Sequence, residues 1–341
     1  MEHFFTYIDI ENFKSIKKLR IDGCKRINLF IGPPNVGKSN IIEALSIFSL
    51  PYFRFQTPKK INNFIRLNYP AELFYNANIQ EKAYIRSQKT QIEIKYNKSL
   101  GFTELSYGDF NFIKLIDHIK FDNKLYLRNG SVLSNNKYLP AVKKYAFNIN
   151  TKYNRANINE LVPPYGNNIA NVIESDRSIY DIINKYFEDS NMYLSIDKYT
   201  ESIKFIKEIN NKEVLIFSFN LIADTLQRMI LFKTAILSNQ NSILLFEEPE
   251  ANCYPPYIST FADDMFKSKT NQFFVATHSP FIVNELLEET RDDSELAIYI
   301  VYWKDNQTQV KLLSNEEMNE VYQHGIDLFF NNDLFLVRDG E

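Results

Sequence analysis

Residues 32–39 match the phosphate-binding loop pattern G-x-x-x-x-G-K-[ST], and this match constrains the fold more than any other feature of the chain. An apolar run suited to a β-strand, 27–31, precedes the loop, and residues 38–49 follow it with helical spacing. The order strand, loop, helix is the context in which the pattern is specific. Backbone N–H groups of the loop and the positive end of the helix dipole form a cradle for phosphate oxygens. The sequence therefore predicts a binding site for a nucleoside triphosphate.

The residues of this loop have distinct expected roles. Lys38 is expected to reach the β- and γ-phosphates, and the Ser39 hydroxyl is expected to bind Mg²⁺. Gly32 and Gly37 supply backbone freedom, and Asn35 is the non-glycine residue type most tolerant of positive φ. The predicted nucleotide-binding set comprises Gly32, Pro33, Pro34, Asn35, Val36, Gly37, Lys38, Ser39 and, directly after them, Asn40.

The charge composition argues against a dedicated nucleic-acid-binding protein. The chain has 39 Lys and Arg against 42 Asp and Glu, a net charge of −3, whereas nucleic-acid binders usually carry a basic excess. Nucleic-acid binding stays open only through a partner or through local basic clusters, each of which equally fits a solvated face. These clusters lie at 14–18, 20, 25–26 and 59–60.

The two cysteines, Cys24 and Cys253, are far apart and have no metal-ligand spacing. A disulfide framework or a zinc site is therefore not expected, and a reducing cytoplasm fits. The N-terminus lacks the basic region and cleavage site of a signal peptide. Apolar runs stay well below the ~20 residues of a membrane-spanning helix. We expect a cytoplasmic protein that makes no membrane contact.

The first part of the chain has the patterning of an antiparallel sheet. Residues 4–10 and 16–22 alternate like paired strands around a turn at 11–15, and further period-2 runs with turn signals follow between about 83 and 128. A polar, Asn-rich segment interrupted by prolines then predicts an irregular insertion at about 131–165.

The second part alternates strand and helix, which predicts a parallel sheet with covering helices. A helix at about 168–187 and three short strands precede this alternation. We expect one bilobed domain over 1–341, with an N-terminal lobe of about 1–130 and a C-terminal lobe of about 166–341. The three strands lie near 192–197, 201–208 and 212–218, and the alternating elements are expected at 222–238, 242–247, 255–267, 272–277, 280–289 and 296–303.

Two strands of the second part end in chemically useful side chains. The strand at 242–247 leads into Glu247 and Glu248, and carboxylates at the C-terminal end of a parallel strand lie at the ligand edge of the sheet. Glu247 is expected to organise Mg²⁺ through a bound water, and Glu248 to act as general base on the attacking water. His278, at the end of the strand 272–277, is expected to donate a hydrogen bond to the γ-phosphate and orient the water.

These motifs in this order resemble the ABC-type ATPases of the RecF/SMC/OLD-like group. The resemblance is carried by GPPNVGKSNIIEAL at 32–45, LLFEEPEA at 244–251 and ATHSP at 276–280. It implies an α/β P-loop NTPase of ABC-ATPase type, with a mainly parallel central sheet, flanking helices and an antiparallel β subdomain in the N-terminal lobe. It also implies ATP and Mg²⁺ as ligands, and a homodimer in which two ATP molecules are sandwiched between opposed protomers.

Such a sandwich requires a signature element from each protomer, at the start of the helix before the acidic strand. The nearest match is the segment Ala223, Asp224 and Thr225, in which Thr225 would supply a hydroxyl group. Relatives usually carry a serine with adjacent glycines there, and this chain has neither glycine. Asp224 would repel phosphate unless Arg228 balances it across one turn. An ordinary capped helix is the alternative interpretation.

Other positions depart from the pattern of the resembling group. Glu247 replaces the usual aspartate, and Asn252 and Tyr254 stand where relatives often carry histidines. Gln56 is a candidate for the glutamine that links the two lobes, and Lys14 stands where some relatives place a basic residue on the nucleotide. No long heptad region and no C-terminal TOPRIM nuclease segment are recognisable, so we expect a separately encoded effector protein.

Two functions are compatible with these features. In the first, the chain is a Mg-dependent ATPase whose ATP-bound head dimer switches a partner or a nucleic-acid process, in DNA repair or maintenance or in anti-phage defence. In the second, it is a nucleotide-gated binding module with little or no ATP turnover, because the altered signature element holds ATP without promoting its hydrolysis. A transporter subunit is disfavoured, because the residues after the loop and at 244–251 match the soluble branch.

Overall fold

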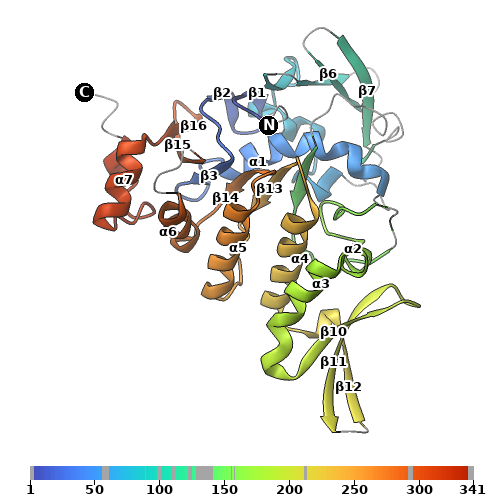
Figure 1. The fold of residues 1–341 in the computed structure, drawn as a ribbon. Helices are drawn as coiled ribbons and strands as arrows, with labels where there is room; N and C mark the ends of the chain where they lie inside the picture. The colour runs from blue at the N-terminus through green and yellow to red at the C-terminus, as the bar shows by residue number, and fades with distance from the viewer. Residues whose placement is uncertain are drawn as a thin grey trace.

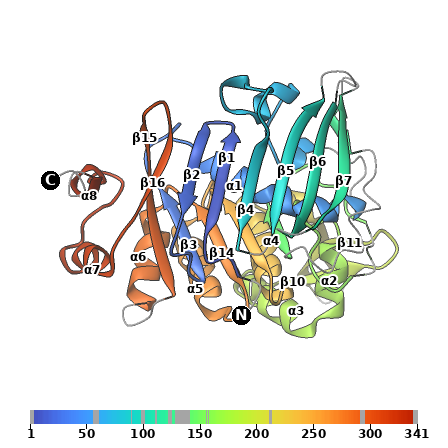
Figure 2. The same ribbon diagram turned by 90° about the horizontal axis from the view of Figure 1, so that it is seen from above.

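The strands of the protein form three sheets in the part of the chain that the structure describes (Figures 1 and 2). The structure is a computed structural model that describes residues 4–55, 61–88, 90–97, 102–109, 112–121, 125–127, 141–154, 156, 158–210, 213–290 and 295–336.

A six-stranded sheet lies at the centre of the fold and is parallel except for its last strand. Neighbours pair in the order β16-β15-β3-β14-β13-β9, and only β16 runs antiparallel to its neighbour β15. The strands are β3 (Ile27–Ile31), β9 (Val142–Tyr145), β13 (Ile243–Glu247), β14 (Gln272–Ala276), β15 (Leu296–Lys304) and β16 (Gln307–Leu312). This arrangement confirms the predicted mainly parallel sheet.

Both faces of this sheet are buried, which explains why its strands read as continuous apolar runs. In β13, Ile243 and Leu245 face one hydrophobic core, which also contains α1 (Lys38–Ser46) and the N-terminal strands. The alternate residues Leu244 and Phe246 face a second core that is formed with the helices of the C-terminal part. The sheet thus separates two cores.

Helices α4 (Asp224–Ser238), α5 (Pro255–Lys267) and α6 (Pro280–Glu289) lie side by side on one face of the central sheet (Figure 1). Their buried apolar residues form most of the second core. The remaining α-helices are α2 (Ile169–Ser175), α3 (Arg177–Asn184), α7 (Asn315–His324) and α8 (Asp333–Leu336). Short 3₁₀ helices are η1 (Ile47–Phe55), η2 (Ile61–Asn63), η3 (Pro70–Leu73), η4 (Tyr75–Ala77), η6 (Lys185–Ser190) and η7 (Phe219–Leu221).

An antiparallel sheet covers α1 from the other side, as predicted for the N-terminal part (Figure 2). Its seven strands pair in the order β2-β1-β4-β5-β6-β7-β8. They are β1 (Ile8–Phe13), β2 (Ile16–Ile21), β4 (Ala83–Ser87), β5 (Gln91–Asn97), β6 (Phe102–Asp109), β7 (Phe112–Phe121) and β8 (Leu125–Leu127).

A third, three-stranded antiparallel sheet precedes α4 and extends away from the central sheet (Figure 1). Its strands are β10 (Met192–Asp197), β11 (Ser202–Asn210) and β12 (Glu213–Ser218). They agree with the strands predicted near 192–197, 201–208 and 212–218, and the base of the sheet packs into the second core through residues such as Leu194 and Phe205.

Three local predictions were wrong. The segment predicted to be irregular, about 131–165, contributes the strand β9. The helix predicted at 168–187 is broken at Asp176, because this carboxylate accepts hydrogen bonds from Ser178 N–H and Ile179 N–H and begins a new helix, α3. The predicted turn at 11–15 is shorter, since β1 continues to Phe13.

Among the described residues, no helix is long and apolar enough to cross a membrane.

Candidate functional site

The predicted site residues lie at one edge of the central sheet. The strands β3, β14 and β13 are parallel neighbours, so their C-terminal ends meet at the same edge. The phosphate-binding loop leaves β3, His278 follows β14, and Glu247 and Glu248 end β13. The topology therefore brings together three motifs that are far apart in the sequence.

The loop at 32–39 has the backbone conformation that its residue types favour. Gly32, Asn35 and Gly37 have φ of 141°, 64° and 102°, a region in which most L-residues are strained. A Cβ on Gly37 would also lie 2.0 Å from Thr308 Oγ1. Gly37 is therefore required both for its φ and for the space beside Thr308.

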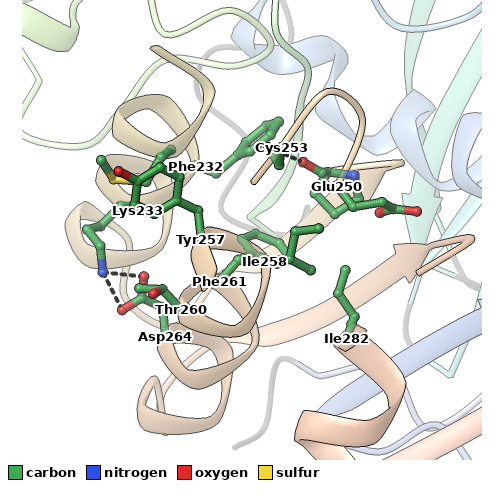
Figure 3. A pocket seen from close by; sticks show the side chains of 12 residues that line it. Phe232, Lys233, Glu250, Cys253, Tyr257, Ile258, Thr260, Phe261, Asp264 and Ile282 are labelled. Carbon is green, nitrogen blue, oxygen red and sulfur yellow. Dashed lines mark hydrogen bonds and ion pairs between the residues drawn. The ribbon is translucent and has the colours of Figure 1, made fainter. Parts of the chain in front are cut away.

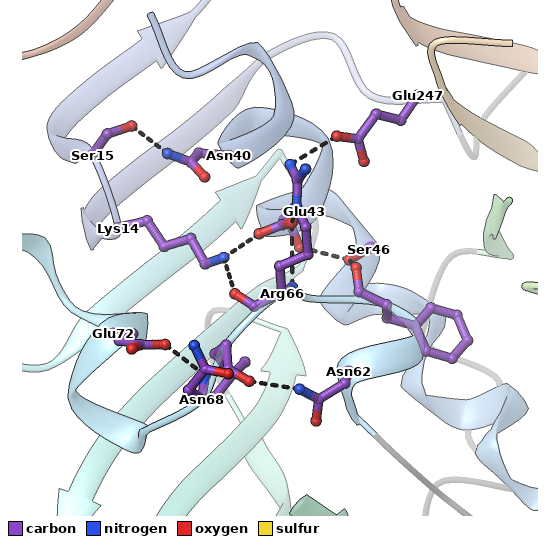
Figure 4. Close-up of polar contacts among 12 residues, drawn as sticks. Lys14, Ser15, Asn40, Glu43, Ser46, Asn62, Arg66, Asn68, Glu72 and Glu247 are labelled. Atoms are coloured by element: carbon purple, nitrogen blue, oxygen red, sulfur yellow. Dashed lines mark hydrogen bonds and ion pairs between the residues drawn. The ribbon is translucent and has the colours of Figure 1, made fainter. Parts of the chain in front are cut away.

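A hydrogen-bonded support from other parts of the chain holds this loop. Thr308 Oγ1, on β16, donates to the Val36 carbonyl at 2.8 Å and lies 2.7 Å from Ser15 Oγ. Asn40 Nδ2 donates to the same Ser15 oxygen at 2.6 Å. The side chain of Asn40, predicted to bind nucleotide, thus supports the loop through the turn between β1 and β2 (Figure 4).

The Lys38 ammonium group lies against its own loop. Its Nζ donates to the carbonyls of Gly32 and Pro33 at 2.7 Å each. Burial lowers the pKa of Lys38 to about 8, although Glu248 and Glu250 act in the opposite direction. A phosphate group in the cradle would give this ammonium group an anionic partner in place of two neutral carbonyls.

Ser39 and Glu247 form a donor set that suits Mg²⁺. The Ser39 hydroxyl lies within hydrogen-bonding reach of the Glu247 carboxylate. Burial alone would raise the pKa of Glu247, but Lys144, Ser39 and Arg66 together lower it, so the carboxylate is ionised at neutral pH. No group of three or more His, Cys, Asp or Glu residues with metal-site geometry occurs in the described ranges. Mg²⁺ does not need one, because it is usually bound by one or two protein oxygens together with phosphates and water.

Glu248 and His278 lie close together beside this pair. Glu248 Oε1 is 3.8 Å from His278 Nε2, and the Glu248 side chain is 52% exposed. Glu248, where the chain leaves β13, has φ of 46°. This backbone conformation is strained for a glutamate. Burial and the nearby Lys38 lower the pKa of His278, although Glu248 raises it. The imidazole is consequently neutral at pH 7, with one N–H to donate.

Sequence reasoning missed Glu250, the third acid of the run. Its Oε1 accepts a hydrogen bond from the His278 backbone N–H at 2.6 Å, and Thr277 also hydrogen-bonds to this side chain. Its Oε2 is buried and has no hydrogen-bond partner among the described residues, and burial raises the pKa of the group. Glu250 thus ties the end of β13 to the segment that carries His278. The run of three acids around Pro249 was the available signal.

The predicted signature segment forms the start of α4. Ala223 is the N-cap residue, and its side chain makes no capping hydrogen bond. Asp224 pairs with Arg228 at 3.0 Å, as proposed from their spacing. Thr225 Oγ1 donates to the carbonyl of Asn252 at 2.7 Å, which ties the segment to the loop after the acids. An N-cap alanine cannot accept from the first backbone N–H groups of a helix, so those at the start of α4, before Leu226, can serve another acceptor.

Residues 27–284, about three quarters of the chain, match the protein family described as "AAA domain, putative AbiEii toxin, Type IV TA system". The chain belongs to this AAA-domain family. No curated protein sequence matches it.

Solved structures that are similar in fold include SMC heads. One is the crystal structure of an SMC head bound to the C-terminal winged-helix domain of ScpA, with a TM-score of 0.55 and 15% identity over 92% of this chain and 99% of that one. Another, from Pyrococcus furiosus, is an SMC head with an extended coiled coil bound to the C-terminal domain of ScpA, with a TM-score of 0.52 and 12% identity over 94% and 99%. The fold is therefore that of ABC-type P-loop ATPases of the SMC/RecF-like group, which confirms the resemblance.

In this member of the AAA-domain family, the site continues into an ion-paired network that the sequence did not reveal (Figure 4). Glu43, fully buried on α1, pairs with Lys14 and, at 2.8 Å, with Arg66 Nε. Arg66 Nη2 in turn reaches Glu247 at 2.8 Å, and Lys144 Nζ reaches the same carboxylate at 3.2 Å. Lys14, predicted to contact nucleotide, is thus held on Glu43 and on the Arg66 carbonyl.

Three further residues belong to the surroundings of the site: Gln56 and Tyr254, which the sequence singled out, and Lys144, which it did not. Gln56, the candidate for the lobe-linking glutamine, lies outside the described residues. The strand β9, which is the neighbour of β13, carries Lys144 beside Glu247. Tyr254, in the loop after the acids, is largely exposed.

A small cavity lies between α4, α5 and α6, behind the acidic run (Figure 3). Phe232, Ile258 and Phe261 are among its apolar lining residues, and the ion pair of Lys233 with Asp264 lies on one side. Its volume of about 20 Å³ is room for roughly one water molecule. The cavity therefore does not compete with the sheet edge as a ligand site.

Proposed function

We propose that this protein is a Mg²⁺-dependent ATPase whose two copies close around two ATP molecules. The observation that carries the proposal is the convergence of Lys38, Ser39, Glu247, Glu248 and His278 at one sheet edge. A phosphate cradle, a metal-binding pair, a general base and a hydrogen-bond donor together are what phosphoryl transfer to water requires.

Each group has a role that its surroundings support. Lys38 and the loop N–H groups would bind the β- and γ-phosphates, and Ser39 and Glu247 would hold Mg²⁺, with Glu247 acting through a metal-bound water. The metal supplies neutralisation of the charge that develops on the phosphates. Glu248, exposed and within 3.8 Å of His278, accepts the proton of the attacking water. His278 donates a hydrogen bond to the γ-phosphate and positions that water.

The second protomer supplies the start of α4 to the first protomer's ATP. The uncapped first turn and the exposed Ala223 support this role, because a helix N-terminus binds phosphate through its N–H groups. The Arg228 side chain neutralises Asp224, which removes the main electrostatic objection. The division into an N-terminal lobe of about 1–130 and a C-terminal lobe of about 166–341, with β9 joining the central sheet between them, belongs to the same proposal.

We further propose that a separately encoded effector protein reads the closed state, in a toxin–antitoxin or anti-phage defence system. The description of the AAA-domain family supports the defence role, and the similar SMC head crystallised with a ScpA domain supports a protein partner. Direct DNA binding has less support, because four of the described basic side chains on or beside the N-terminal sheet are ion-paired. These pairs are Lys18 with Glu11, Arg20 with Asp9, Lys82 with Glu93 and Arg86 with Glu11.

A nucleotide-gated module with little turnover is the second candidate. The glycine-free segment Ala223 to Thr225 favours it, since glycines would let the partner's backbone approach the γ-phosphate more closely. In that case ATP would close the dimer and stay bound.

Phosphate release by the wild type and by Glu248→Gln distinguishes the two functions. The ATPase proposal predicts steady release by the wild type and a loss of at least about 100-fold in the variant, the magnitude typical of a general base. Binding of a fluorescent ATP analogue should persist in Glu248→Gln and be lost in Lys38→Ala. Equal, negligible release by wild type and Glu248→Gln with intact analogue binding would favour the gated module. Analogue binding by Lys38→Ala as tight as by the wild type would contradict both functions.

A further inference from the structure

We propose that Arg66 masks Glu247, so that the metal enters this site only together with a triphosphate. The inference rests on the proposed function for the identity of the ligands. It concerns a step before hydrolysis and assigns a role to a residue that no motif identifies.

Both oxygens of the Glu247 carboxylate are already engaged by cations. Oε1 accepts from Arg66 Nη2 at 2.8 Å, and Oε2 lies 3.2 Å from Lys144 Nζ. The side chain is only 17% exposed, so water provides little competition for these contacts. A divalent cation that approaches Glu247 alone meets two positive charges at the carboxylate it needs.

The two cations differ in how firmly they are held. Lys144 is 7% exposed and also donates to the Phe64 carbonyl at 3.0 Å, so its position is fixed by the surrounding core. Arg66 is 67% exposed, and its Nε contacts Glu43 at 2.8 Å, a second anion that can retain the side chain once Nη2 leaves Glu247. Arg66 is therefore the group that moves away when the carboxylate receives a metal–water complex.

The charge of the whole network explains why a triphosphate is needed for this exchange. Lys14, Arg66 and Lys144 pair with two carboxylates, Glu43 and Glu247. Glu248 acts on both Arg66 and Lys38, and when these neighbours are counted the balance is four cationic side chains to three carboxylates. This excess positive charge repels a free divalent cation and attracts a polyanion. A triphosphate compensates the excess and brings its metal into reach of Ser39 and Glu247.

Substitution of Arg66 by glutamine removes the mask and keeps the backbone contacts of the residue to Lys14 and Glu43. We expect Arg66→Gln to bind Mn²⁺ without nucleotide about tenfold more tightly than the wild type, the order of magnitude for removing one partly solvated charge near a divalent ion. Arg66→Lys keeps the charge and should bind Mn²⁺ like the wild type. The free and bound Mn²⁺ are measured by electron paramagnetic resonance on the nucleotide-free proteins.

Arg86→Gln is the matched control, because it removes the same charge from an ion pair on the N-terminal sheet. Its Mn²⁺ affinity should equal that of the wild type. A second measurement adds a non-hydrolysable ATP analogue. The Mn²⁺ affinities of Arg66→Gln and the wild type should then differ by less than about threefold, because in the wild type Arg66 has then left Glu247.

Equal Mn²⁺ affinity of the nucleotide-free wild type and Arg66→Gln would overturn the inference, and so would an equal gain in Arg86→Gln. Failure of the analogue to bind any of these proteins would contradict the proposed function. The Mn²⁺ affinities measured without nucleotide would still test whether Arg66 blocks Glu247.

Discussion

Glu250 is the residue whose role can be separated most cleanly from nucleotide binding. Its carboxylate holds the His278 backbone N–H at 2.6 Å without belonging to the phosphate cradle. We expect Glu250→Ala to lower ATP turnover by about 10- to 100-fold, because the segment that carries His278 loses its attachment to β13. Steady-state phosphate release together with analogue binding measures this effect, and the affinity for the analogue should stay within about threefold of the wild type.

Glu250→Gln is the control for this prediction, since an amide oxygen can still accept the hydrogen bond from His278 N–H. It should keep most of the turnover. A Glu250→Gln variant as inactive as Glu250→Ala would show that the charge, and not the hydrogen bond, is what the site needs.

Individual residues were predictable where a motif fixes both their type and their spacing. Asn35 has the positive φ expected of it, and the Asp224–Arg228 pair forms across one turn as its spacing indicated. Arg66 and Lys144 were not predictable, because each reaches Glu247 from a distant element. Contacts of this kind are set by tertiary packing and leave no local pattern in the sequence.

At the scale of elements, β16 supports the phosphate-binding loop through a single hydroxyl group. Thr308 Oγ1 donates to the Val36 carbonyl and contacts Ser15. Thr308→Val should weaken ATP-analogue binding by about tenfold, because a buried loop carbonyl loses its donor. Fluorescence titration measures the affinity, and Thr308→Ser, which keeps the hydroxyl, should bind like the wild type. Unchanged binding by Thr308→Val would show that the loop holds its conformation alone.

At the opposite edge of the central sheet, Arg26 joins the ends of several elements. Its guanidinium group donates to the carbonyls of Met265 and Ser268, both at 2.8 Å, and pairs with Glu295 at 2.7 Å. Hydrogen bonds from Arg26 and Lys269 lower the pKa of Glu295 to about 2, although partial burial opposes them. The ionised carboxylate therefore stabilises the fold.

We expect Glu295→Gln to lower the free energy of unfolding by about 1–2 kcal/mol at pH 7. Because the folded pKa lies below the unfolded value of 4.5, the contribution is present above pH 4.5 and is lost as the pH falls toward 2. In urea unfolding, the difference in free energy of unfolding between Glu295→Gln and the wild type should be largest at pH 7 and should decrease as the pH is lowered. As a control, Asp263→Asn removes an exposed ion pair with Lys267 within one helix, and it should lower the free energy of unfolding by less than about 0.5 kcal/mol.

Elements were predicted best where apolar period and capping agree. The helices α5 and α6 begin and end at the predicted residues, since a proline starts each one and buried residues recur at helical spacing. The strand β9 was missed because Lys143 and Lys144 interrupt its apolar run. Both lysines are buried and paired with acids, which local polarity could not indicate.

At the scale of the molecule, the layers that cover the two faces of the central sheet determine which edge can bind a ligand or a second copy. The antiparallel sheet and α1 cover one face of the central sheet, and α4 to α6 cover the other, so the C-terminal edge of β3, β14 and β13 carries the chemistry (Figures 1 and 2). The phosphate-binding loop follows β3 of the central sheet, whereas the start of α4 belongs to the helical layer on one face of that sheet. Under the proposed function, each site is complete only when two copies combine them.

Complementation between two inactive variants tests this shared site most directly. Lys38→Ala removes the phosphate contact, and Thr225→Glu places a negative charge in the segment proposed to face the partner's ATP. Each variant alone should release no phosphate. In an equimolar mixture, half of the dimers are mixed and each has one intact site, so the mixture should recover about a quarter of the wild-type rate per protein. A mixture as inactive as its components would contradict a site built from two protomers.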